Sequence, residues 1–263
     1  MTMTGSAPLR ARDAAARRRR NVHAIASGKG GVGKTWIAIT LAQALAKSGR
    51  RTLLFDGDLG LANVDIQLGL APAQDLGAVI AGKVALSDAI LPCPAGGFDM
   101  IAGRSGSGSL ASISGGRLEA MLSELDAVAA GYDRVILDLG AGVERTVRAL
   151  AATAESCIVV TTDEPTSLTD AYAFIKVTAA RNSGAKFQIV VNMAASNREG
   201  EHTYQTLLKA CEGFLKISPR LLGVVRRDRS VKDTIRAQMP LLTRHPNSDA
   251  AQDVVAIAAK LGG

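Results

Sequence analysis

The chain has 263 residues, of which 47% are hydrophobic and only 3% are aromatic. It can bury a sizeable core, but it lacks the aromatic side chains of a platform that stacks nucleic-acid bases. The formal net charge is +7, yet residues 1–20 contain six arginines and one aspartate, a net charge of +5. The basic character therefore belongs to this terminal segment and not to the rest of the chain.

Three cysteines, Cys93, Cys157 and Cys211, lie far apart in the sequence. Their odd number and wide spacing argue against a disulfide framework, a C-x-x-C metal site and an iron–sulfur cluster. No apolar run approaches the ~18 residues that a membrane-spanning helix needs, and no signal-peptide core follows the arginine run. We therefore expect a cytoplasmic protein in a reducing compartment.

Residues 1–20 lack a periodic apolar face, and we predict that they form a flexible, arginine-rich tail. From residue 21 to residue 263, short apolar runs alternate with helical patterns, and no linker rich in Pro, Gly or Ser divides them. This alternation predicts a single α/β domain. We expect a doubly wound, mostly parallel sheet with helices on both faces, as in P-loop nucleoside triphosphatases.

A glycine-rich loop joins the first predicted strand, residues 22–27, to a helix in which apolar residues recur at positions 37, 41 and 45. The loop, G-K-G-G-V-G-K-T, fits the pattern G-x-x-x-x-G-K-[ST]. In this pattern backbone N–H groups close on phosphates, Lys34 reaches the β- and γ-phosphates, and the Thr35 hydroxyl meets Mg²⁺. We predict that ATP or ADP binds to Gly28, Lys29, Gly30, Gly31, Val32, Gly33, Lys34, Thr35 and Trp36.

A second predicted strand, at residues 51–55, is followed by two carboxylates, Asp56 and Asp58. An apolar run at residues 65–70 comes next, and then two small helices at residues 76–81 and 86–90. A strand is predicted at residues 98–101. Residues 103–116 are rich in Gly and Ser, which predicts an exposed, mobile loop.

A helix at residues 117–130 leads into an apolar strand that ends at Asp138, the pattern of a Walker B acid. Asp56, Asp58, Asp138 and Asn192 all stand at the carboxyl ends of predicted strands. Because ligands bind along that edge of open parallel sheets, these residues predict one common site. Further strands are predicted at residues 156–161, 187–192 and 221–225, and further helices at residues 168–181, 202–215 and 248–261.

Hydrolysis of ATP needs an in-line water and a metal ion that bridges the β- and γ-phosphates. Asp58 is the candidate for orienting the water. Asp138 would hold Mg²⁺ through water beside Thr35, and Asp56 would support the hydration shell of the metal. Each carboxylate could instead cap the helix that follows its strand.

A generic phosphate loop does not need Lys29 at its second position. With this lysine the loop resembles the deviant Walker A motif of the MinD/ParA class of ATPases. The resemblance implies that Lys29 crosses a dimer interface and touches the partner's nucleotide, so that Lys29, Lys34 and Asp58 form the catalytic set of an ATP-dependent homodimer. A solvated loop lysine is the simpler alternative.

The segment D-E-P-T-S-L-T-D-A-Y, residues 163–172, extends the resemblance to the flagellar-number branch of this class, FlhG, also called FleN or YlxH. The resemblance runs from residue 21 to the C-terminal helix. It implies that Asn192 binds the adenine edge, although Asn192 could instead cap the next turn. It also implies that Asp228 lies near the base, in a segment where arginine replaces the family's usual proline.

The two ends of the chain differ from those of the relatives. Residues 13–19 partly match the D-Q-A-x-x-L-R element with which flagellar relatives activate the GTPase FlhF, but the glutamine and leucine are missing. Residues 1–20 could equally be a solvated tail or bind nucleic acid or an anionic surface. Residues 249–263 contain one lysine and no aromatic residue, so we expect no stable membrane binding there.

The resemblance implies a slow, dimer-dependent ATPase that regulates flagellar number or placement. Hydrolysis would return the dimer to monomers, and a basal-body or polar protein would recruit the chain to a cell pole. The alternative is a ParA-like ATPase whose ATP-bound dimer moves a cargo by binding DNA nonspecifically. DNA binding that requires ATP and weakens with salt would favour this alternative. In this alternative the dimer would bind DNA through Arg20, Arg226, Arg227 and Arg229.

Overall fold

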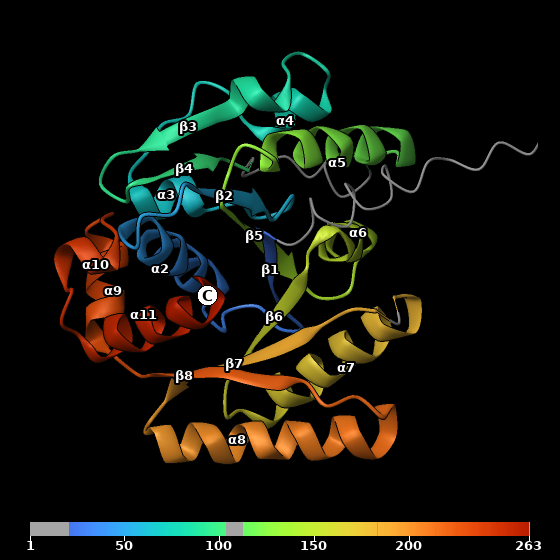
Figure 1. The fold of residues 1–263 in the computed structure, drawn as a ribbon, viewed down its shortest axis with the longest axis vertical. Helices are drawn as coiled ribbons and strands as arrows, with labels where there is room; N and C mark the ends of the chain where they lie inside the picture. The colour runs from blue at the N-terminus through green and yellow to red at the C-terminus, as the bar shows by residue number, and fades with distance from the viewer. Residues whose placement is uncertain (1–20, 104–112, 183, 263) are drawn as a thin grey trace, which may run out of the picture.

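The computed structural model describes residues 21–103, 113–182 and 184–262. Its centre is an eight-stranded sheet with the strand order β3-β4-β2-β5-β1-β6-β7-β8. Helices cover both faces of this sheet (Figure 1). Among the described strands, β3 and β4 pair antiparallel and the other neighbouring strands pair parallel, so the predicted doubly wound, mostly parallel sheet is confirmed. The arginine-rich tail and most of the loop predicted at residues 103–116 lie outside the described residues.

The central strands are buried along their whole length, because helices pack on both sides of them. β1, β2 and β6 contain only buried residues, and their near-continuous apolar runs are typical of parallel sheets. The strands are β1 (Val22–Ser27), β2 (Thr52–Gly57), β3 (Ile90–Cys93), β4 (Phe98–Ile101), β5 (Arg134–Ala141), β6 (Ser156–Thr161), β7 (Phe187–Ala194) and β8 (Arg220–Arg226).

The helices form two groups, one on each face of the sheet (Figure 1). One face carries α2 (Lys34–Lys47), α3 (Val64–Leu68), α9 (Arg229–Arg236), α10 (Leu241–Arg244) and α11 (Asp249–Gly262). The other face carries α4 (Leu76–Ile80), a 3₁₀ turn at Leu86–Ala89, α5 (Gly115–Ala129), α6 (Arg145–Thr153), α7 (Pro165–Arg181) and α8 (Asn197–Ala210), which a π-helical turn at Cys211–Leu215 extends.

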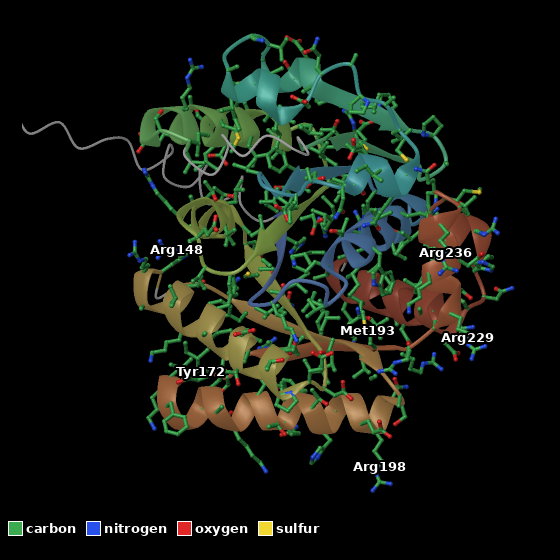
Figure 2. All side chains as sticks on the ribbon, turned by 180° about the vertical axis from the view of Figure 1, so that it is seen from behind. Arg148, Tyr172, Met193, Arg198, Arg229 and Arg236 are labelled. Carbon is green, nitrogen blue, oxygen red and sulfur yellow. The ribbon has the colours of Figure 1, made fainter. Side chains whose placement is uncertain are left out.

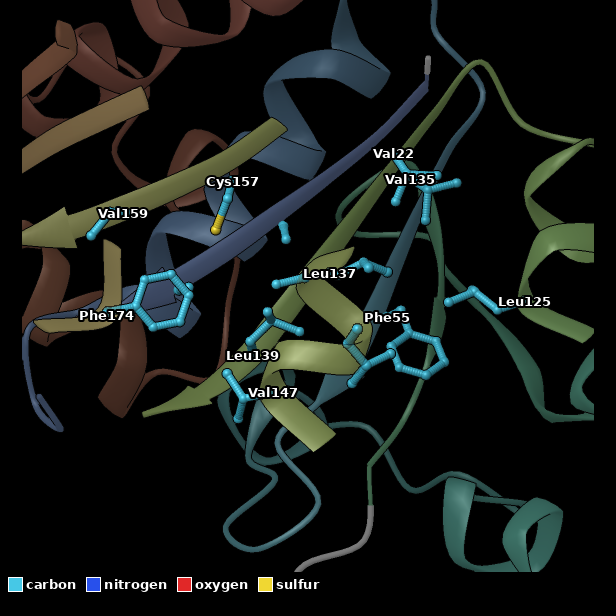
Figure 3. Packing of buried hydrophobic residues seen from close by; sticks show 14 of the residues in the cluster. Val22, Phe55, Leu125, Val135, Leu137, Leu139, Val147, Cys157, Val159 and Phe174 are labelled. Atoms are coloured by element: carbon cyan, nitrogen blue, oxygen red, sulfur yellow. The ribbon is translucent and has the colours of Figure 1, made fainter. Parts of the chain in front are cut away.

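Alternate residues of each strand enter different cores, as the pleat of a strand requires. In β5, Leu137 and Leu139 belong to the core beneath α5, α6, α7 and α8, whereas Ile136 belongs to the core beneath α2 and α11. Figure 3 shows Leu139 packed beside Val147 of α6, with Phe55 of β2 next to them. This packing fixes the carboxyl ends of β2 and β5 relative to the glycine-rich loop.

Several elements differ from the sequence-based prediction. β3 and α6 were not predicted, nor were α9 and α10. β3 contains Pro92 and lies at the edge of the sheet, the one place where a strand tolerates proline. The helices predicted to begin at residues 168 and 202 begin earlier, at Pro165 and Asn197, because Pro165 occupies the first helical turn and Ser196 caps α8.

All three cysteines are buried and have free thiols. Among the residues that the structure describes, no helix combines the length and the apolar character that crossing a bilayer would take.

His23 of β1 is a buried titratable group at the edge of the sheet opposite the glycine-rich loop. It is 6% exposed, and its Nδ1 lies 2.9 Å from Ser156 Oγ of the neighbouring strand β6. Burial, together with the nearby charge of Arg134, lowers the pKa of His23 from 6.5 to about 4. The folded state therefore keeps His23 neutral at a pH where the unfolded chain already protonates it.

We expect this histidine to destabilise the protein in acid. Because its folded pKa lies below its unfolded pKa, stability is lost as the pH falls from about 6.5 towards 4, by about 2 to 3 kcal/mol. Urea denaturation at pH 7 and pH 4.5 measures this loss. A His23→Gln variant cannot titrate at this position. The difference in free energy of unfolding between the parent and this variant, taken at each pH, removes the contribution of all other titrating groups. A difference that does not change with pH would contradict the prediction.

Candidate functional site

The loop between β1 and α2 needs glycine at two positions for different reasons. Gly33 precedes α2 with a φ of 91°, a left-handed conformation that suits glycine, and a side chain there would clash with Asn192 and Trp36. A side chain at Gly28 would clash with the backbone carbonyl of Asp170 in α7. The space beside Gly30 and Gly31 is open. The loop is therefore packed against its neighbours at Gly28 and Gly33, whereas the space beside Gly30 and Gly31 remains free for a ligand.

A cavity of about 610 Å³ lies in front of this loop, at the carboxyl edge of the sheet. This is the edge at which parallel α/β sheets bind ligands. Its walls come from the loop and the start of α2, from the ends of β2 and β5 with the residues after them, and from α9. The polar groups of the wall include Lys34, Thr35, Asp58, Asn63, Gln67, Glu144, Thr146 and Lys232.

Lys34, in the first turn of α2, is the buried cation of the site. It is 8% exposed and lines the cavity. Burial lowers the pKa of Lys34, while the negative charges of Asp138 and Asp58 act in the opposite direction. A phosphate group would supply the negative charge that stabilises the charged amine in this place.

Two buried carboxylates lie side by side behind the cavity. Asp56 of β2 and Asp138 of β5 are partners in the register of the two parallel strands, and they are 0% and 1% exposed. Burial raises the pKa of both carboxyls, and the charge of Asp56 raises that of Asp138 further. The sequence predicted that the strand ends at Asp138, but β5 continues to Ala141.

The two carboxylates have different partners. Asp56 accepts hydrogen bonds from the backbone N–H groups of Asp58, Asn63 and Val64 at 3.1–3.2 Å. It thus holds the start of α3, which agrees with the helix-capping alternative. The Thr35 side chain is close enough to Asp138 to act against the rise in the pKa of that carboxyl, and Asp138 Oδ1 is buried and has no partner among the described residues.

This oxygen set suits Mg²⁺ bound together with a nucleotide. The described residues contain no group of three or more His, Cys, Asp or Glu side chains that could hold a metal ion by themselves. Mg²⁺ commonly binds through one or two protein oxygens, several waters and the phosphates of its nucleotide. The unpartnered Oδ1 of Asp138 and the adjacent Thr35 hydroxyl fit that mode of binding.

Asp58 stands at the wall of the cavity, on the segment that follows β2. Its Oδ1 accepts hydrogen bonds from the backbone N–H groups of Gly60, at 3.1 Å, and Leu61, at 2.9 Å. A side chain at Gly140 of β5 would come within 3.2 Å of the same oxygen. The turn after β2 and the glycine of β5 together fix the position of this carboxylate.

Lys29 does not line the cavity of its own chain. Its Nζ lies 2.5 Å from Glu164 Oε2 and donates to Thr166 Oγ1 at 2.9 Å. These two partners flank Pro165, the first residue of α7, and belong to the D-E-P-T-S segment singled out from the sequence. The two lysines of the loop thus point to different places.

Asn192 and Asp228 lie outside the residues that wall the cavity. Asn192 is 1% exposed; its Nδ2 donates to the Val32 carbonyl at 2.7 Å, and its Oδ1 is buried without a partner in the described part of the chain. Asp228 caps α9 through the backbone N–H of Ser230 at 2.8 Å and accepts a second bond from Ala250 N–H. Asn192 therefore supports the glycine-rich loop, and Asp228 supports α9.

One wall of the cavity was not predicted from the sequence. Met193 follows Asn192 in β7 and has an unusual φ of 58°, and Figure 2 shows it near the middle of the molecule. Val231, Lys232 and Ile235 of α9 also line the cavity. These residues carry no motif, and α9 reaches the site because it packs against α3 and α10 on the face of the sheet that carries α2.

The comparisons with known proteins agree with this geometry. The family described as CbiA, the CobQ/CobB/MinD/ParA nucleotide-binding domain, matches residues 23–241. The chain is 37% identical to the antiactivator FleN of Pseudomonas aeruginosa, over 91% of this chain and 85% of that protein. It is 33% identical to the flagellum site-determining protein YlxH of Helicobacter pylori, over 90% of this chain and 80% of that protein.

A solved structure extends the similarity to the fold. The septum site-determining protein MinD of Pyrococcus horikoshii, complexed with Mg-ADP, superposes with a TM-score of 0.77 at 26% identity, covering 92% of this chain and 95% of the other. The glycine-rich loop and the cavity in front of it lie within the matched residues 23–241. This chain belongs to the CobQ/CobB/MinD/ParA family of nucleotide-binding domains.

Proposed function

We propose that the chain is an ATP-hydrolysing switch that dimerises with ATP and regulates the number or placement of flagella. The observation that carries this proposal is the 37% identity to the antiactivator FleN over 91% of the chain. The similarity to the flagellum site-determining protein YlxH supports it independently. The second lysine of the phosphate loop, Lys29, supports the dimeric form of the switch.

The residues at the cavity can divide the work of hydrolysis. The backbone of residues 28–35 and the Lys34 amine would hold the phosphates, and Thr35 and Asp138 would hold Mg²⁺, which neutralises charge on the β- and γ-phosphates. Asp58 would accept a hydrogen bond from the attacking water and so orient it. Asn192 and Asp228 would act on the base indirectly, through the loop and through α9.

Lys29 would complete the site of a second copy of the chain. In that arrangement it leaves Glu164 and Thr166 and contacts the phosphates of the partner's ATP. A charge-assisted phosphate contact is worth about 1.5 to 3 kcal/mol, which corresponds to roughly a 10- to 150-fold change in dimer affinity. Hydrolysis would remove the contacted phosphate and return the dimer to monomers.

Replacing Lys29 by alanine tests both the switch and its biological role. We expect Lys29→Ala to bind ATP as a monomer but to lose ATP-driven dimerisation, measured by sedimentation, and most of its turnover. Cells that carry this variant in place of the parent should show an altered flagellar number or position by electron microscopy. Lys209→Ala, which removes an exposed lysine from α8, is the matched control. Normal dimerisation would refute the role of Lys29, and parental flagella in cells lacking the chain would refute the flagellar role.

The DNA-binding alternative loses one of its arginines in the structure. Arg226 bonds to Asp253 through Nε and Nη2, at 2.9 and 2.8 Å, and pairs with Asp249 through Nη1 at 2.8 Å. An arginine paired in this way is not available to a DNA phosphate.

We further propose that residues 1–20 bind a flagellar partner such as the GTPase FlhF or a polar protein that recruits the chain to a cell pole.

A further inference from the structure

The cavity in front of the glycine-rich loop has two ends, which lie on opposite sides of β1. In the strand order, β2 and β5 lie on one side of β1, whereas β6 and β7 lie on the other. Asp58 and Gly140 bring the ends of β2 and β5 to the cavity, and Met193 brings the end of β7. β5 and β7 are separated by three strand spacings, roughly 14 Å. A ligand that fills the cavity from end to end must therefore be elongated.

The two ends differ in their chemistry. The end at β2 and β5 carries the carboxylate of Asp58 and adjoins the groups assigned above to the phosphates and Mg²⁺. At the β7 end, Trp36, Met193 and Val231 line the cavity and form an apolar slot, with the exposed Lys232 next to them on α9. An elongated ligand that suits both ends carries its charge at one end and an apolar group at the other.

Met193 reaches the slot through a β-bulge. Val191 pairs with Val224 and Ala194 pairs with Arg226, so three steps along β7 match two steps along β8. Val191 and Ala194 consequently enter the same core, the one beneath α5, α6, α7 and α8, although they are three residues apart. Met193, between them, has a left-handed φ of 58°, a conformation that costs free energy in any residue but glycine. Bulges of this kind re-aim side chains next to active sites, and this one turns Met193 into the nucleotide cavity.

Trp36 closes the slot from the side of α2. A side chain on Gly33 would clash with both Trp36 Nε1 and Asn192 Nδ2, so the indole and the residue before Met193 meet at the end of the glycine-rich loop. Trp36 is 8% exposed, and together with Val231 it also lines a small pocket beneath α9. Only two residues separate β8 from α9, so Val231, in the first turn of α9, lies near the end of β7.

A nucleotide has the same two-ended chemistry as the cavity, because it joins charged phosphates to a flat aromatic base. We propose that the base lies in the apolar slot, against Trp36 and Met193, and that these two side chains are its binding residues. A thioether packs favourably on an aromatic ring, and contact between the base and the indole adds to this. The family resemblance assigned the base to Asn192 and Asp228, which do not line the cavity. This proposal rests on nucleotide binding and is independent of the flagellar role.

The test compares ADP with ribose 5-diphosphate, which lacks only the base, in calorimetric titrations of the full chain with Mg²⁺. ADP is used because it is not hydrolysed and lacks the γ-phosphate proposed to hold the dimer. Met193→Gly removes the whole side chain at a φ that suits glycine, so the bulge should be preserved. It should weaken ADP binding by about 2- to 12-fold, the range of a thioether–aromatic contact, and leave the affinity for ribose 5-diphosphate unchanged. Met193→Leu, which keeps an apolar side chain of similar size, should recover most of the loss.

The matched control is Met239→Ala, which removes an exposed methionine that does not line the nucleotide cavity and should change neither affinity. Trp36 is the only tryptophan of the chain, so its fluorescence reports on the slot and should change more with ADP than with ribose 5-diphosphate. Parental ADP affinity in Met193→Gly, or equal losses for the two ligands, would overturn the proposal, as would equal fluorescence changes in the parent. A parent that binds neither ligand would refute nucleotide binding itself and the proposal with it.

Discussion

Lys34→Ala is expected to lose nucleotide affinity by about 10- to 150-fold, the amount that one charge-assisted phosphate contact contributes. Lys34 is nearly buried, lines the nucleotide cavity and faces the negative charges of Asp138 and Asp58. Without it, those carboxylates would meet the phosphates with no compensating cation. Titration with a fluorescent ATP analogue under conditions that keep the protein monomeric measures the loss.

The matched control is Lys29→Ala, which removes the same charge from the same loop. Because Lys29 contacts Glu164 and Thr166 and does not line the cavity, its removal should leave monomer affinity close to that of the parent. Equal losses in the two variants would mean that the lysines act only through their general charge. The distinct roles proposed for them would then be wrong.

Asp58→Ala is expected to keep ATP binding and to lower turnover by about 100-fold or more, the range in which a positioned proton acceptor contributes. The carboxylate stands at the cavity wall and does not belong to the phosphate loop, so binding and hydrolysis should separate. Stopped hydrolysis should in turn make the ATP-bound dimer persist. Phosphate release and sedimentation on the same sample measure the two effects.

The second variant at this position, Asp58→Asn, distinguishes chemistry from structure. Asn retains a side-chain oxygen that can accept the bonds from Gly60 and Leu61, so the turn after β2 should be preserved. It cannot accept a proton as a carboxylate does. If Asp58→Asn hydrolyses ATP at the parental rate, the carboxylate is not needed as a proton acceptor, and Asp58 acts only through hydrogen bonds that an amide oxygen can also accept.

Local patterns were enough to predict the elements that position the phosphates. The apolar run before Gly28, the glycine-rich loop and the helical repeat after it are contiguous, so each supports the assignment of the next. β5 and Asp138 were predicted on the same basis. α6 was missed because it is short, only three residues separate it from the end of β5, and it has no side chain that caps its start.

The other wall of the site depends on contacts between distant segments. α9 reaches the cavity through the packing of α9, α10 and α11 beside α2, which no spacing in the sequence records. The role of Asp56 illustrates the same limit. Its position after a predicted strand suggested that it supports the hydration shell of a metal ion, and this role stays a prediction. Its hydrogen bonds from Asn63 and Val64 could not be predicted, because those backbone groups approach only when the loop has folded.

The contact of Lys29 with Glu164 and Thr166 changes what dimerisation costs. If Lys29 moves to a partner's nucleotide, it exchanges one set of acceptors for another, so the number of paired charges stays nearly constant. The Lys29 side chain is also already ordered in the monomer by these contacts. A lysine without them would lose up to about 2 kcal/mol of rotamer entropy when it docks on the nucleotide. The pair is partly exposed, at 36% and 61% for the two side chains, and exposed pairs contribute only about 0–1 kcal/mol. If Lys29 contacts the partner's γ-phosphate, it gives up a weak ion pair for a stronger contact only when that phosphate is present. The dimerisation equilibrium would then distinguish ATP from ADP.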